Sequence, residues 1–171
     1  MILRVPDAAD IPALARFART SFISKFGHLY QPEDLTAFLQ EAFSEAAIAA
    51  ELADPQRRYC LAVDEAGQLG GYCKIALDTG FPDHVRGRVP MELKQLYTDP
   101  ERTGQGIGAL LMDWAMAQFR AEGGDEVHLS VWSENFGAQR FYARYGFTKV
   151  ADVVFMVGNH RDHDLLYARM L

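Results

Sequence analysis

The sequence predicts a mixed α/β (α+β) fold, and three observations lead to this prediction. Segments with strand-like alternation are interspersed with segments whose apolar residues recur at helical spacing. The second half of the chain reads strand, helix, strand, helix, strand, strand, so one strand–helix–strand crossover must be parallel and right-handed. Of the 171 residues, 49% are hydrophobic and 23% charged, as in ordinary globular proteins. We expect residues 1–171 to form a single domain.

The first part of the chain is predicted to contain a short strand and three helices. Residues 2–5 read as the strand, and Asp10 resembles the N-cap of an amphipathic helix. A second helix is expected to begin at Pro32, because proline and the two acidic residues after it suit a helix start. Ser44 is expected to cap a third helix, which ends before Asp54-Pro55 because proline restricts the residue before it.

A hairpin is predicted next, with strands at 59–63 and 69–77 and a turn at Ala66-Gly67. With a two-residue turn, Cys60 and Cys73 face each other across the two strands. Opposed cysteines could form a disulfide, but two buried thiols fit a reducing cytosol better.

The remaining elements follow from alternation, helical spacing and glycine punctuation. They are a surface loop at 78–90, a strand at 91–98, a helix from about 105 to 122, a strand at 127–132, a helix at about 136–145, and strands at 147–157 and 164–170 on either side of a turn at 158–160.

Charge and composition exclude several classes of protein. Seventeen Lys and Arg against 23 Asp and Glu give a net charge of −6, whereas nucleic-acid binding usually needs a basic surface. An acidic surface favours a cationic partner such as an amine. The sequence has no apolar run of the roughly 18 residues that a membrane span needs and no signal-peptide pattern. The two cysteines lack zinc-site spacing, so no metal is expected. The predicted location is the cytoplasm.

The most informative segment is the glycine-rich turn Gly104-Gln105-Gly106-Ile107-Gly108, between a predicted strand and a predicted helix. Glycines let the backbone approach a ligand closely, and the first N–H groups of a helix have no partner within it. With the helix dipole, they form an anion site suited to a pyrophosphate. The P-loop pattern is absent, and too little chain follows for a doubly wound dinucleotide-binding sheet. A tight turn without a ligand is the alternative.

After this turn come Asn135 and Phe141-Tyr142-Ala143-Arg144-Tyr145-Gly146-Phe147. Together these motifs resemble the GNAT superfamily of acyl-CoA N-acyltransferases, closely over residues 91–150 and in element order over the whole chain. The resemblance implies a GNAT-like, mostly antiparallel twisted sheet of about seven strands, with about four to five helices and a central strand–helix–strand crossover. It also implies acetyl-CoA as co-substrate, no metal, and direct attack by a primary amine in a ternary complex.

The resemblance further implies which residues bind the cofactor. Main-chain groups of Leu96 and Thr98, on either side of Tyr97, would hold the pantetheine arm as if it were an added strand. The pyrophosphate would lie against Thr103, Gly104, Gln105, Gly106, Ile107, Gly108 and Ala109. The family usually has Arg or Gln where this chain has Thr103, so a side-chain phosphate contact is weakened or moves to Arg102. Asn135 would bind the cofactor arm, cap the next helix, or do both.

Two residues are predicted to be catalytic. Glu92 lies where some family members place the base that deprotonates the amine, although a solvated strand edge is the alternative role. Tyr142 resembles the general acid aimed at the coenzyme A sulfur, with a packed aromatic ring as the alternative. A main-chain N–H near Leu96 could hold the oxyanion. His128 is expected to be exposed or packed rather than catalytic.

The sequence says less about the acceptor amine than about the cofactor. Residues 26–34, Val131-Trp132 and 155–158 resemble bacterial spermidine/spermine-type N-acetyltransferases, which implies a polyamine acceptor. Glu33 and Asp34 could pair with a polycation, but acidic residues are common at helix starts. A protein N-terminus, an amino acid and an aminoglycoside stay open, as does a homodimer. The alternative from another functional class is a non-catalytic acyl-CoA-binding sensor.

Overall fold

Seven strands form one sheet in the computed structural model, which describes all 171 residues. The strand order is β1-β2-β3-β4-β5-β7-β6, and only β4 and β5 run parallel. The elements are β1 (Ile2–Arg4), α1 (Ile11–Phe26), α2 (Pro32–Phe43), α3 (Glu45–Ala53), β2 (Arg57–Val63), β3 (Leu69–Ala76), β4 (Pro90–Thr98), α4 (Ile107–Ala121), β5 (Glu126–Trp132), α5 (Phe136–Arg144), β6 (Thr148–Val157) and β7 (His160–Met170). The predicted mixed, mostly antiparallel fold is confirmed.

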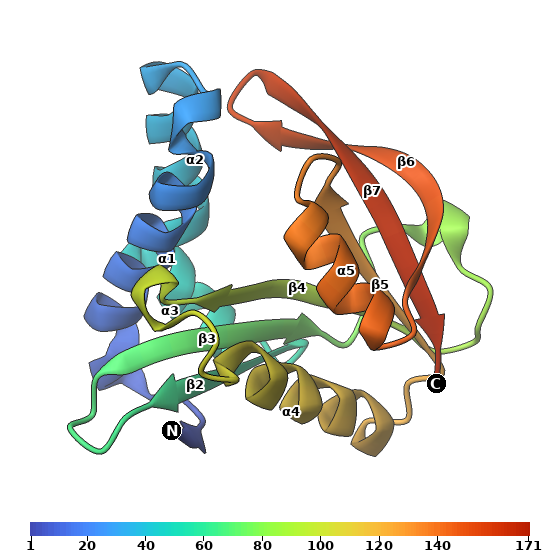
Figure 1. The fold of residues 1–171 in the computed structure, drawn as a ribbon, viewed down its shortest axis with the longest axis horizontal. Coiled ribbons are helices and arrows are strands. Elements are labelled where there is room, and N and C mark those ends of the chain that lie inside the picture. The colour runs from blue at the N-terminus through green and yellow to red at the C-terminus, as the bar shows by residue number, and fades with distance from the viewer.

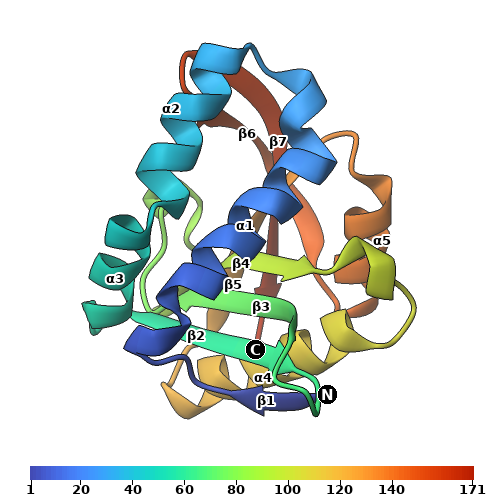
Figure 2. The same ribbon diagram turned by 90° about the vertical axis from the view of Figure 1, so that its left-hand side faces the viewer.

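Helices cover both faces of the sheet (Figures 1 and 2). Helices α1, α2 and α3 pack on one face around a cluster of 12 buried apolar residues. Helix α4 packs on the other face around a cluster of 16, and α5 contributes partly buried side chains to its margin. The sheet therefore separates two cores, as expected for a mixed sheet whose strands alternate their side chains between two covered faces.

Strands β4 and β5 separate in the middle of the sheet. Their pairing runs from Pro90 opposite Glu126 to Glu92 opposite His128 and ends there. Strand β4 continues to Thr98 paired with β3 alone, and the register shift of that pair leaves Lys94 as an extra, bulged residue. A bulge bends its strand and increases the local twist. The sheet therefore opens on the β5 side of β4.

Three sequence-based boundaries are corrected. The Asp10 side chain does not cap α1; it accepts hydrogen bonds from the Asp7 N–H (2.8 Å) and from Arg4. Helix α4 begins at Ile107 rather than near 105, because Gly106 before it is left-handed with φ +77°. Strand β7 begins at His160 rather than 164, since His160 already pairs with Val157 across a tight turn.

The predicted hairpin is confirmed: Cys60 lies opposite Cys73, and both are buried free thiols. Pro32 begins α2 as predicted, and the Ser44 hydroxyl accepts a hydrogen bond from the Ala47 N–H at the start of α3. None of the helices combines the length and apolarity needed to cross a bilayer.

Candidate active site

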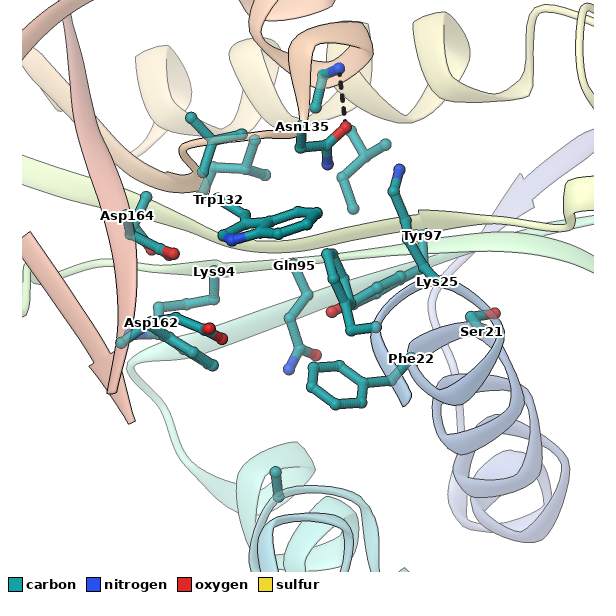
Figure 3. Close-up of a pocket in the computed structure, with 18 of the residues that line it drawn as sticks. Ser21, Phe22, Lys25, Lys94, Gln95, Tyr97, Trp132, Asn135, Asp162 and Asp164 are labelled. Carbon is teal, nitrogen blue, oxygen red and sulfur yellow. Dashed lines mark hydrogen bonds between the residues drawn. The ribbon is translucent and has the colours of Figure 1, made fainter. Parts of the chain in front are cut away.

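A cavity of about 690 Å³ lies beside the opening between β4 and β5 (Figure 3). Its walls come from β4, β5 and β7, from α1 and α2 on one side and from the start of α5 on the other. The predicted site residues that line it are Glu92, Leu96, Tyr97, Thr98, Thr103, Asn135 and Tyr142. Residues 104–109 are not in its lining; they continue from Thr103 as the adjoining turn into α4.

The turn presents unpaired donors. No main-chain N–H from Gly106 to Ala109 donates a hydrogen bond within the chain, and the first helical bond runs from the Leu110 N–H to the Gly106 carbonyl. These N–H groups and the positive end of the α4 dipole suit an anion. Ile107 contributes only its main chain, because its side chain is buried in the core.

The three glycines of the turn differ in whether the fold requires glycine at their positions. Gly104 and Gly106 have φ values of +83° and +77°, where only glycine avoids strain. At Gly108 a Cβ would meet only the Phe141 ring and the Thr98 methyl, at 3.8 Å, an ordinary contact. The fold therefore requires glycine at 104 and 106 but not at 108, where a Cβ would make only ordinary contacts.

The side chains beside the turn are already engaged. The Thr103 hydroxyl donates to the Pro100 carbonyl at 2.8 Å. The Arg102 guanidinium, expected as a replacement phosphate contact, instead pairs with Asp64 at 2.9 Å and with Asp99 at 3.5 Å. The donors that stay unpaired at the turn are its main-chain N–H groups, and a phosphate contact from Arg102 stays a prediction.

The unpaired side of β4 offers main-chain groups to the cavity. Beyond the end of β4, the Asp99 N–H donates to the Gly70 carbonyl at 2.9 Å, toward β3. Main-chain groups alternate sides along a strand, so those of Leu96 and Thr98 point away from β3 and toward the opening. The β4 edge can therefore pair with an extended ligand.

Tyr142 lies between the aromatic packing of α5 and the cavity. Its ring contacts those of Phe141 and Phe147, while its hydroxyl, in the cavity wall, forms no hydrogen bond within the chain. Burial, with the nearby Cys73 thiol, raises the pKa of the Tyr142 hydroxyl. The group therefore keeps its proton at neutral pH and is free to donate a hydrogen bond.

Glu92 is buried, with 4% of its surface exposed, so the alternative of a solvated strand edge is wrong. Its carboxylate is 2.9 Å from the Lys94 ammonium and accepts a hydrogen bond from the Gly80 N–H at 2.8 Å. Both oxygens are therefore engaged. His128 is packed, as expected: it is fully buried, and its Nδ1 lies 2.8 Å from the Thr79 hydroxyl.

Of the two roles considered for Asn135, the structure shows the helix cap and leaves the side chain placed for the other. Its Oδ1 accepts a hydrogen bond from the Ala138 N–H at 3.3 Å and so caps α5 (Figure 3). Because Asn135 also lines the cavity, its amide nitrogen stays available to a ligand.

Glu33 and Asp34 do not line the cavity, so a polycation bound there would not meet them. The Asp34 carboxylate accepts a hydrogen bond from the Asn159 N–H at 2.7 Å and holds the β6–β7 turn against α2.

Two carboxylates of β7, Asp162 and Asp164, line the cavity and were missed by the sequence analysis. Asp162 accepts a hydrogen bond from the Tyr30 hydroxyl, and its other carboxylate oxygen lies 3.1 Å from the His160 Nε2. Asp164 is 6% exposed and forms no hydrogen bond of ordinary geometry. Burial and the neighbouring Asp162 raise the pKa of Asp164 to about 6, although the Ser130 hydroxyl partly counteracts them.

A signal for these residues was present in the alternation of β7. Asp162, Asp164, Leu166 and Ala168 all occupy the buried side of the strand. Because the predicted strand began at 164, the two acids were not recognised as consecutive members of an inward-facing row. No group of three or more His, Cys, Asp or Glu side chains is arranged to hold a metal ion.

Comparisons with known proteins agree on one family. A family model described as "Acetyltransferase (GNAT) family" matches residues 18–147. The chain is 30% identical over 163 residues to an uncharacterized N-acetyltransferase of Lactobacillus delbrueckii subsp. lactis, covering 95% of this chain and 92% of that protein. It is 32% identical over 163 residues to an uncharacterized N-acetyltransferase of Mycobacterium tuberculosis, covering 95% and 98% respectively.

Solved structures share the fold. PaiA N-acetyltransferase from Thermoplasma acidophilum, crystallised with coenzyme A, matches with a TM-score of 0.80 and 21% identity, covering 99% of this chain and 98% of that one. A GCN5-related N-acetyltransferase from Rhodopseudomonas palustris matches with a TM-score of 0.76 and 19% identity, covering 99% and 95%. At these identities the likeness concerns the fold.

Proposed function

The chain belongs to the acetyltransferase (GNAT) family, and from this premise we propose that it transfers an acetyl group from acetyl-CoA to a primary amine, by direct attack in a ternary complex. Residues 1–171 would act as a single catalytic domain. The observation that carries the proposal is the continuity of the site. Unpaired N–H groups before α4 lead to the unpaired edge of β4 and then to the free Tyr142 hydroxyl.

This arrangement suits the parts of acetyl-CoA in order. The pyrophosphate would accept hydrogen bonds from the N–H groups of residues 106–109. The pantetheine arm would extend along β4 and pair with Leu96 and Thr98, with the Asn135 amide beside it. Gly108 would let the phosphates approach the helix closely.

The acyl transfer needs an electrophile and a leaving group. A main-chain N–H near Leu96 would stabilise the oxyanion that forms as the amine attacks. The Tyr142 hydroxyl would then donate to the sulfur as the carbon–sulfur bond breaks. Because a phenol is less acidic than a thiol, with reference pKa values of about 10 and 8.5, hydrogen bonding contributes more than complete proton transfer.

The reaction also needs a base, because an alkyl ammonium with a pKa of about 10.4 is protonated at neutral pH. Glu92 is the base predicted from the sequence, and it lines the cavity. Its contacts with Lys94 and Gly80 occupy both oxygens. It would therefore act through a water molecule, and it competes for this role with Asp164 in the same cavity.

A polyamine is the acceptor we propose first. Its support is the charge of the cavity, where Glu92, Asp162 and Asp164 outnumber Lys25 and Lys94. An amino acid, an aminoglycoside and a protein N-terminus share the ammonium group and are the alternatives. A cytoplasmic location is part of the proposal, supported by the two free buried thiols.

The test is an amine screen with spermidine and the alternative acceptors, measuring acetyl-CoA-dependent release of free thiol. Acetyl-CoA is expected to raise the melting temperature and NAD is not, since only a ligand that binds the native state stabilises it. Stabilisation by acetyl-CoA, with no release of coenzyme A thiol in the presence of any of the amines, would instead indicate the non-catalytic sensor. Stabilisation by NAD alone would contradict the cofactor.

Tyr142→Phe isolates the proposed acid, because it keeps the ring and removes the hydroxyl. We expect kcat to fall by roughly 10- to 100-fold, with acetyl-CoA affinity within about threefold of wild type. Tyr167→Phe is the matched control, since Tyr167 packs against the same core but does not line the cavity. Unchanged turnover in Tyr142→Phe would remove the residue from the mechanism.

A further inference from the structure

Asp164 occupies a position in the cavity that is costly for a carboxylate. It lies opposite Trp132 in the β5–β7 pair, and the two side chains share the face of the sheet that α1 and α2 cover. It is 6% exposed. Figure 3 shows its carboxylate directed into the cavity, beside Trp132 and Asp162. A charge removed from water is unfavourable unless hydrogen bonds or an opposite charge compensate it.

The other buried carboxylates of this face have donors from the chain. Glu92 has the Gly80 N–H and the Lys94 ammonium. Asp162 has the Tyr30 hydroxyl. Asp164 has only the Ser130 hydroxyl near it, outside ordinary hydrogen-bond geometry and without a positive charge, and it faces the cavity. A cationic ligand with N–H donors would supply what the chain does not.

The position of Asp164 also fits the site of acetyl transfer. Burial raises the pKa of the Tyr97 hydroxyl, and Tyr142 and Asp164 raise it further. Tyr97, Tyr142 and Asp164 all line the same cavity, with Tyr142 at the proposed leaving group and Asp164 on the wall formed by β7. An amine bound to Asp164 would therefore share this cavity with the thioester.

The charged and titratable groups around Asp164 come from several elements. On its own strand, Asp162 raises the pKa of Asp164 and His163 lowers it. Tyr30, from the segment after α1, is near both acids of β7, and each of them raises the pKa of its hydroxyl. The remaining groups that share the cavity are Lys25 of α1 and Glu92, Lys94 and Tyr97 of β4. No cation pairs directly with Asp164.

We propose that Asp164 binds the ammonium group of the acceptor and takes the proton that must leave before attack. The inference rests on the proposed acetyltransferase function. The ammonium gives one proton to the carboxylate, and the freed lone pair forms the carbon–nitrogen bond as the carbon–sulfur bond breaks. The second proton lost by the nitrogen reaches the sulfur with the help of Tyr142. Asp164 then releases its proton to solvent, so an ammonium and a thioester give an amide, a thiol and one proton.

The test compares Asp164→Asn with wild type on spermidine, benzylamine and aniline. Spermidine and benzylamine are protonated at neutral pH, whereas aniline is already neutral and needs no base before attack. We expect kcat/KM for the two ammonium acceptors to fall at least about 100-fold, the low end of general-base contributions. With aniline, we expect kcat/KM of Asp164→Asn to fall by less than about tenfold.

The pH profile gives a second readout. Wild-type kcat/KM should fall as the pH decreases through about 6, where Asp164 becomes protonated, and this limb should be absent in Asp164→Asn. Glu92→Gln should keep the limb. Asp152→Asn, an exposed carboxylate of β6 outside the cavity, is the matched control and should behave as wild type.

Three results would overturn the proposal. Asp164→Asn could retain activity within about threefold and keep the acidic limb. It could lose activity equally with aniline and benzylamine, which would indicate a structural role. Glu92→Gln could lose the limb instead, which would assign the base to Glu92. An active wild type with any of these results removes only this inference, whereas a wild type inactive on every amine removes the proposed function as well.

Discussion

Two buried carboxylates on neighbouring strands have pKa values shifted in opposite directions. Glu126 of β5 is fully buried and accepts hydrogen bonds from the main-chain N–H groups of Arg86 and Gly87, both at 2.7 Å. Burial favours its neutral form, but these donors, His128 and the Arg86 guanidinium together lower the pKa of Glu126 to about 2. Asp164 of β7 is almost as buried, and its pKa is raised to about 6.

The difference separates a structural acid from one available to a ligand. Glu126 holds the loop at 78–90 onto the sheet, and the chain itself supplies the donors that its charge needs. Asp164 keeps its charge at neutral pH at an energetic cost that the Ser130 hydroxyl and His163 reduce only in part, since its pKa stays at about 6. Strain and cost of this kind concentrate at functional sites. Burial alone therefore does not distinguish the two roles; the source of the donors does.

The largest expected effect comes from removing the charge of the structural acid. Glu126→Gln leaves one acceptor oxygen for three or more donors and turns an NH₂ group toward other N–H groups, so we expect a loss of roughly 2–4 kcal/mol in unfolding free energy. Urea denaturation at neutral pH measures it, with Asp152→Asn within about 0.5 kcal/mol of wild type as control. A Glu126→Gln variant as stable as that control would contradict a structural role.

The cavity acid should respond with the opposite sign. The pKa of Asp164 is higher in the folded protein, about 6, than in the unfolded chain, about 3.9. The fold therefore loses stability as the pH rises from about 4 to about 6, and this loss stays constant at higher pH. We expect Asp164→Asn to gain about 1–2 kcal/mol above pH 7, a gain that disappears near pH 4.

Denaturation of wild type and Asp164→Asn across this pH range measures the gain. A variant that is less stable than wild type above neutral pH would show that the carboxylate is compensated within the fold, and the contrast with Glu126 would fail.

Local signals explain which elements could be predicted. Pro32 begins a helix and Ser44 caps one because their effects depend on a few neighbouring residues. The glycines at 104 and 106 likewise encode the turn through their backbone conformation alone. The glycine-rich turn was identified in this way, whereas Tyr142 was identified from the resemblance to the GNAT superfamily.

The acceptor side of the cavity depends on long-range packing instead. Asp162 and Asp164 become buried only because α1 and α2 cover this face of the sheet. Their alternation was obscured by a strand start placed four residues too late, at 164 rather than at 160. Glu92 shows the same limit: its strand was predicted, but its contact with Gly80 joins segments that sequence spacing does not relate.

Gly108, like Asp164, is a residue that the fold does not need, because another side chain fits at its position. A Cβ there meets only ordinary contacts at 3.8 Å, and alanine suits a helix better than glycine by roughly 0.5–1 kcal/mol. We expect Gly108→Ala to keep or slightly raise the melting temperature and to weaken coenzyme A binding about tenfold, or 1.4 kcal/mol. Calorimetric titration with coenzyme A measures the affinity. Unchanged affinity would mean that the phosphates do not approach the helix at this residue.

The smallest expected effect concerns Asp34, an acid whose hydrogen bond lies outside the cavity. Its carboxylate accepts a hydrogen bond from Asn159, and Asp34→Asn keeps an oxygen that can accept the same bond. We therefore expect stability within about 0.5 kcal/mol of wild type and a KM for spermidine within about twofold. Steady-state kinetics beside Asp164→Asn measures the difference between the two acids. A large rise in KM for Asp34→Asn would move polyamine binding from the cavity to the start of α2, since removing the charge there changes little else.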